Sequence, residues 1–89
     1  MRRAAVDIDA EAHALANDLA RGGHPGARDE IHDAIAGGAT GTESLARLSG
    51  VLYELGKRRR IPERPLRRRA RRLRRRINYV LRASLRGTR

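Results

Sequence analysis

Apolar residues recur every three or four positions along the first 56 residues, which is the spacing of one face of an α-helix. The pattern predicts helices over residues 7–21 and 25–36. A third helix is predicted to start at a capping threonine, Thr40 or Thr42, and to end before Gly56. No segment shows the regular alternation of apolar and polar residues that is typical of a strand.

Residues 57–65, with the sequence KRRRIPERP, interrupt the helical pattern. Pro62 and Pro65 are only three positions apart, and the residue before each proline is pushed towards extended geometry. We therefore predict a basic hinge or turn here. Pro65 is well placed to begin the next helix, because proline suits the first turn of a helix.

Residues 66–86 carry the most regular amphipathic pattern of the chain. At 100° per residue, the aliphatic side chains fall on a stripe about 100° wide. This stripe consists of Leu66, Ala70, Leu73, Ile77, Val80 and Leu81. Ten arginines occupy the remaining circumference, so the segment predicts a two-faced helix. The stripe is covered either by the rest of the chain or by a second copy, in a homo-oligomer formed through Leu66, Leu73, Ile77 and Leu81.

These elements together predict an all-α protein. A small three-helix head, residues 1–56, is followed by the proline hinge, residues 57–65. The long arginine-rich amphipathic helix then covers residues 66–86, and residues 87–89 form a short tail.

Charge divides the chain at the same point. Residues 1–56 contain five arginines and nine carboxylates, a formal charge of −4, whereas residues 57–89 contain 16 basic residues and the single acid Glu63, a charge of +15. Such an asymmetry indicates a polyanionic partner. Nucleic acid is the leading candidate, because guanidinium groups bind phosphates bidentately without regard to base sequence. The pattern does not distinguish DNA from RNA.

The predicted phosphate contacts come from arginines on the polar side of the C-terminal helix. They are Arg67, Arg68, Arg71, Arg72, Arg75, Arg76 and Arg82. Tyr79 falls in the same arc, where its ring either stacks on an unpaired base or packs against arginine stems. Asn78 either reads a base edge or is solvated. With about five or six arginines on duplex phosphates, the slope of log K against log salt should be near −5. We thus predict a non-enzymatic nucleic-acid-binding accessory protein.

Two other partners fit the same helix. An acidic protein surface would make the chain a small regulator, such as an inhibitor, an antitoxin or an assembly factor. An anionic membrane surface also suits a basic amphipathic helix, although the stripe contains neither Trp nor Phe. Residues 35–48 resemble a helix-turn-helix in outline, but the second helix offers only Arg47 as a basic reading residue. A plain helical hairpin is the favoured interpretation of that segment.

The sequence contains no motif for catalysis: there is no P-loop, no dinucleotide glycine fingerprint and no nucleophile motif. The absence of cysteine excludes disulfides and thiolate metal sites. Asp29, His32 and Asp33 share a helix face, which suits a weak metal site or an ordinary hydrated surface. We expect no catalytic residue, no bound metal and no cofactor. With no apolar run of signal-peptide or membrane-span length, we expect a soluble cytoplasmic protein without a transmembrane segment.

Overall fold

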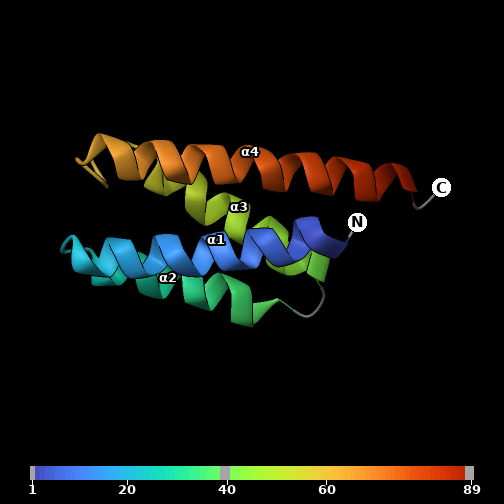
Figure 1. Ribbon diagram of the computed structural model, residues 1–89, viewed down its shortest axis with the longest axis horizontal. Coiled ribbons are helices and arrows are strands. Elements are labelled where there is room, and N and C mark those ends of the chain that lie inside the picture. Colours follow the sequence, from blue (N-terminus) through green and yellow to red (C-terminus); the bar gives the residue numbers. More distant parts are fainter. Residues whose placement is uncertain (1, 39–40, 88–89) are drawn as a thin grey trace.

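The computed structural model describes residues 2–38 and 41–87, with side chains described for residues 8–38 and 41–83. These residues form the helices α1 (Arg2–Arg21), α2 (Pro25–Gly37), α3 (Gly41–Leu55) and α4 (Arg64–Gly87), as Figure 1 shows. The all-α prediction is confirmed. Two helices are longer than predicted. Helix α1 begins at Arg2 and not at residue 7, and α4 extends from Arg64 to Gly87 and not from residue 66 to 86. Thr40, one of the two predicted cap positions, lies outside the described residues.

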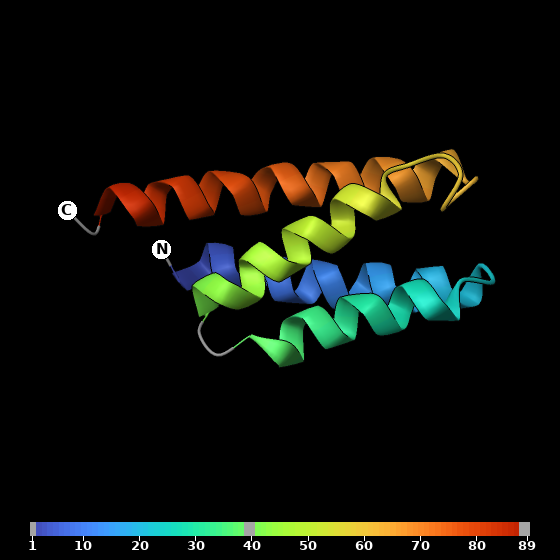
Figure 2. The ribbon, with the colours of Figure 1, turned by 180° about the vertical axis from the view of Figure 1, so that it is seen from behind.

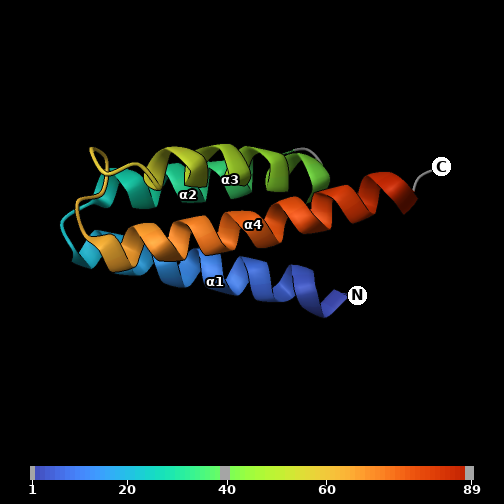
Figure 3. The same cartoon turned by 90° about the horizontal axis from the view of Figure 1, so that it is seen from above.

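The four helices form one closed bundle. Each packs against its neighbour in sequence, and α4 also packs against α1, whereas no close contact joins α2 to α4 or α1 to α3. Figure 2 shows α3 crossing the bundle between α2 and α4, and Figure 3 shows α4 lying alongside α1. Successive helices run in opposite directions, so α2 and α3 form the favoured helical hairpin. The prediction of a three-helix head with a separate C-terminal helix is therefore corrected: α4 is the fourth helix of the bundle.

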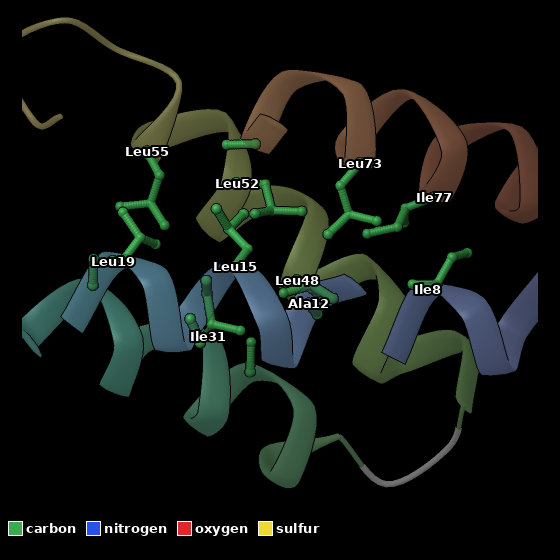
Figure 4. Close-up of a cluster of buried hydrophobic side chains, with 14 of the residues drawn as sticks. Ile8, Ala12, Leu15, Leu19, Ile31, Leu48, Leu52, Leu55, Leu73 and Ile77 are labelled. Carbon is green, nitrogen blue, oxygen red and sulfur yellow. The ribbon is translucent and has the colours of Figure 1, made fainter. Parts of the chain in front are cut away.

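The hydrophobic core consists of aliphatic side chains, and among the described residues Ser49 is the one buried polar side chain. Side chains from all four helices point into one shared core, as Figure 4 shows. The buried set is Ile8, Ala12, Leu15, Ala16, Leu19, Ala27, Ile31, Ala34, Leu48, Leu52, Leu55, Ile61, Ala70, Leu73 and Ile77. The core follows directly from the apolar periodicity, since each helix buries the stripe that its sequence predicts.

The α4 stripe is covered by the chain's own helices. Leu73 and Ile77 are only 3% and 0% exposed, and Leu66, Val80 and Leu81 are half-buried at the edge of the core. Each fully buried aliphatic side chain contributes roughly 1.5–3 kcal/mol. Of the two predicted occupants of the stripe, the structure shows the rest of the chain, so Leu73 and Ile77 are not available to a second copy.

The connection between α3 and α4 is fastened to both helices. The Ile61 side chain is buried in the core, and its backbone N–H donates to the carbonyl of Lys57 at 3.1 Å. Arg67 donates from Nη1 to the carbonyls of Ile61 and Pro62, at 2.9 and 2.7 Å. These bonds fix the position at which α4 begins, with Pro65 in its first turn as predicted.

Candidate nucleic-acid interface

The position of α4 divides its circumference into three sectors. One sector faces α3, one faces α1 and the third faces away from the bundle, because α4 packs against α1 and α3 but not against α2. Arginines are present in all three sectors. The surroundings of each arginine therefore depend on the sector in which it lies.

The sector facing α3 uses its polar side chains as structural groups. Arg71 donates from Nε and Nη2 to the Gly56 carbonyl, at 3.1 and 2.7 Å. A Cβ at Gly56 would lie 3.1 Å from Arg71 Cγ, so glycine permits this approach. Asn78 accepts a 2.8 Å hydrogen bond at Oδ1 from Oγ of the buried Ser49. Its amide therefore joins α4 to α3, in contrast to both the base-reading and the solvated interpretations.

The sector facing α1 forms two ion pairs across the seam between the helices. Arg69 donates to Asp18 Oδ2 at 2.6 Å, and Arg76 lies 2.5 Å from Glu11 Oε2. The hydrogen bond from Arg69, together with one from Arg21, lowers the pKa of Asp18 below its ordinary value of 3.8. The arginines of this sector are therefore neutralised by the chain's own carboxylates.

The lowered pKa of Asp18 predicts an acid-sensitive seam. Its carboxylate stabilises the folded state at pH values above 3.8, and this contribution is lost as the pH falls through the lowered value. We expect Asp18→Asn to melt at a lower temperature than the wild type at neutral pH. The difference should disappear in strong acid, where both side chains are uncharged.

Melting curves followed by circular dichroism across the acid range test this expectation. Asp33→Asn is the matched control, since Asp33 is exposed and forms no ion pair within the described residues. Equal acid sensitivity of the two variants and the wild type would contradict a stabilising role for the Asp18–Arg69 pair.

The outward sector carries what we call the outer strip. It consists of Arg68, Arg72, Arg75, Tyr79 and Arg82. These positions lie between about 160° and 240° from Leu66 around the helix, and from Arg68 to Arg82 the strip is roughly 21 Å long. All five side chains are exposed, and none forms a hydrogen bond or an ion pair with another described residue. The strip is therefore a row of unneutralised guanidinium groups around one tyrosine.

The predicted site residues separate into two groups. Five of the eight form the outer strip, whereas Arg67 and Arg71 are hydrogen-bonded to backbone carbonyls and Arg76 is paired with Glu11. A helical wheel already places Arg67, Arg71 and Arg76 nearer to the apolar stripe, at about 100°, 140° and 280° from Leu66. It does not show which group of α1 or of the α3–α4 connection each of them meets. Tyr79 is 73% exposed and makes no cation–π or ring contact with another described residue, so its ring is accessible to a stacking partner.

Sequence reasoning missed Tyr53 on α3. This tyrosine is 52% exposed, and the Arg74 guanidinium and the Lys57 ammonium lie 4.9 and 4.8 Å from its ring centroid. A signal was present in the sequence, because Tyr53 falls about 100° away from Leu52 on the helical wheel. An aromatic residue placed outside the apolar stripe is an indication of surface use.

The fold and the site together define a small four-helix bundle with one strongly cationic outer face. In comparisons with known proteins, no family model, curated protein or solved structure matches this chain. In the described part of the chain, no group of three or more His, Asp or Glu side chains is arranged to hold a metal ion. No helix of that part is long and apolar enough to cross a membrane. The function is therefore inferred from the residues of the outer strip.

Proposed function

We propose that this protein is a non-enzymatic nucleic-acid-binding accessory protein. The outer strip binds backbone phosphates, and four other arginines of α4 hold the helix in place, namely Arg67, Arg69, Arg71 and Arg76. The observation that carries the proposal is the row formed by Arg68, Arg72, Arg75 and Arg82, which are exposed and form no ion pair with a carboxylate within the described residues.

Electrostatics favour an anionic partner for this row. Arginines three or four residues apart, such as Arg68 and Arg72 or Arg72 and Arg75, repel each other by a few tenths of a kcal/mol per pair. A bound phosphate removes this repulsion and accepts charge-assisted hydrogen bonds. Duplex DNA carries one charge per about 1.7 Å, so a strip of roughly 21 Å faces enough phosphates to engage every arginine.

The burial of the α4 stripe argues against the membrane alternative. A helix that binds in a lipid interface inserts its apolar face into the boundary region. In this structure that face includes Leu73 and Ile77, which are buried against α1 and α3. Membrane insertion would require α4 to leave the bundle. An acidic protein surface remains the runner-up partner, and the experiment below distinguishes it.

Binding measured across a salt series tests the proposed function. With four arginines of the outer strip on duplex phosphates, we expect a slope of log K against log salt of about −3.6. This value is shallower than the slope predicted from sequence, because Arg67, Arg71 and Arg76 already have partners within the protein. The probes are a duplex of about 20 base pairs, a single strand of the same sequence and vesicles of anionic lipid.

The full chain is required for this measurement. Removing the residues after position 60 would also remove Ile61, Ala70, Leu73 and Ile77 from the core, so a truncated chain would report loss of folding. Failure to bind either nucleic acid near physiological salt would refute the proposal and favour an acidic protein partner. Preferential binding to the vesicles would favour the membrane alternative instead.

A further inference from the structure

Both aromatic residues of the chain lie on its basic side. The sequence contains no Phe and no Trp, and its two tyrosines are the two exposed large hydrophobic side chains of the described part. Tyr79 belongs to the outer strip, and the ring of Tyr53 is in contact with Lys57 and Arg74. Tyrosine is of intermediate burial in most proteins, and here the hydrophobic core contains only aliphatic residues while both tyrosines stay exposed. The placement of both rings among cations indicates a stacking function.

A groove beside Tyr53 opens onto the outer strip. Its volume is about 430 Å³, within the usual range for small-molecule sites. The groove is lined by Leu52, Tyr53, Gly56, Lys57, Arg71, Arg74 and Arg75. Arg75 is also a member of the outer strip, so a strand bound along α4 passes the mouth of the groove. The lining thus contains one aromatic ring, that of Tyr53, the uncharged residues Leu52 and Gly56, and four cationic side chains.

All charged side chains that line the groove are cationic. No carboxylate lines it, and the nearby Glu54 pairs with Lys57 at 3.1 Å. The Arg74 guanidinium lies 4.9 Å from the Tyr53 centroid, and its Nε is buried without an acceptor in the described part of the chain. Arg75 has no ion pair among the described residues. This set of groups matches a ligand that carries both a flat ring and a phosphate.

We propose that the groove binds one unpaired base of a single-stranded nucleic acid. The base stacks on Tyr53, and the adjoining phosphate binds Arg74 and Arg75. This inference rests on the proposed function and adds its substrate class, which is unpaired strands in preference to duplex. In a duplex every base is already stacked and paired, so no base face is free to stack on Tyr53 unless the base leaves the helix.

Two cations, Lys57 and Arg74, contact the Tyr53 ring, and the interaction strengths allow an incoming base to replace one of them. Base stacking on an aromatic side chain strengthens binding roughly ten- to a hundredfold. An exposed cation–π contact strengthens an interaction only about two- to fivefold. Lys57 is therefore displaced from Tyr53 by an incoming base, and its ammonium group stays close enough to contribute to the phosphate site.

The chain allows a direct optical test. Tyr79→Leu leaves Tyr53 as the single tyrosine of a chain without tryptophan, so the intrinsic tyrosine fluorescence of that variant reports on the groove alone. Adding an oligothymidylate of about 12 nucleotides should quench this fluorescence by stacking. A duplex of equal length should leave it nearly unchanged.

Affinity measurements on Tyr53→Leu complete the test. We expect single-strand binding to weaken about tenfold and duplex binding to stay within twofold of the wild type. Because Tyr53 is exposed, we expect Tyr53→Leu to keep the melting temperature of the wild type, and a melting curve checks this. Lack of quenching, or equal losses on the two probes, would overturn the inference. If duplex binding still depends on the outer strip in that case, the proposed function stands, whereas absence of binding to either probe would refute both.

Discussion

Replacing Arg68 and Arg72 with glutamine is expected to weaken binding to duplex nucleic acid roughly 30-fold at 0.15 M salt, because two phosphate contacts are lost. Each duplex phosphate contributes about 0.9 to the salt slope, so the slope should fall from about −3.6 to about −1.8. Both side chains belong to the outer strip, and neither lines the Tyr53 groove. The measurement is binding of a labelled duplex across a salt series.

A matched control separates the outer strip from net charge. Arg58→Gln with Arg59→Gln removes the same two charges from exposed side chains that have no partner within the described residues, away from α4. We expect this control to change duplex affinity only a few-fold. Glutamine has nearly the helix propensity of arginine, so the α4 variant should melt at or slightly above the wild-type temperature. Equal losses in the two double variants would mean that net charge, and not the outer strip, drives binding.

Leu73→Ala is expected to destabilise the whole bundle by about 2–5 kcal/mol, because it leaves a cavity in the shared core. This is a large part of the total stability of a domain of this size, which is on the order of 5–15 kcal/mol. Since α4 closes the bundle between α1 and α3, the helical signal should be lost in one transition at a lower temperature. Circular dichroism with chemical denaturation measures the change in unfolding free energy.

Leu66→Ala provides the comparison on the same helix. Leu66 is half-buried at the edge of the core, so the same truncation should cost about half as much or less. If α4 were a separate tail, Leu73→Ala would not alter the melting of the remaining helices. Equal and small effects of the two substitutions would therefore contradict the closed four-helix arrangement.

Contacts within the bundle fix the position of α4. Hydrogen bonds from Arg67 and Arg71, the Asn78–Ser49 bond and the Arg69–Asp18 ion pair hold the helix in one position and rotation. The outer strip is thereby presented on a rigid element, which reduces the ordering cost of association. Under the proposed function, the arginines without a phosphate contact would still contribute to binding, because they position the outer strip.

By itself, the sequence determined the local features of this protein. Apolar periodicity over a few turns is a short-range property, so the helices, their buried stripes and the glycine or proline positions between them could be predicted. The charge difference between residues 1–56 and 57–89 was equally visible. The sequence also placed Tyr79 among arginines on the polar arc of its helix.

Only the tertiary structure decided which partner each inner arginine meets. A helical wheel puts Arg76 about 80° from Arg68 and nearer to the stripe. It does not show that Arg76 meets Glu11 of α1, whereas Arg68 stays exposed. The groove joins Tyr53 on α3 to Arg74 and Arg75 on α4, which lie more than twenty positions later in the sequence. Periodicity reports how each helix divides into faces, but packing between distant segments selects which face remains open.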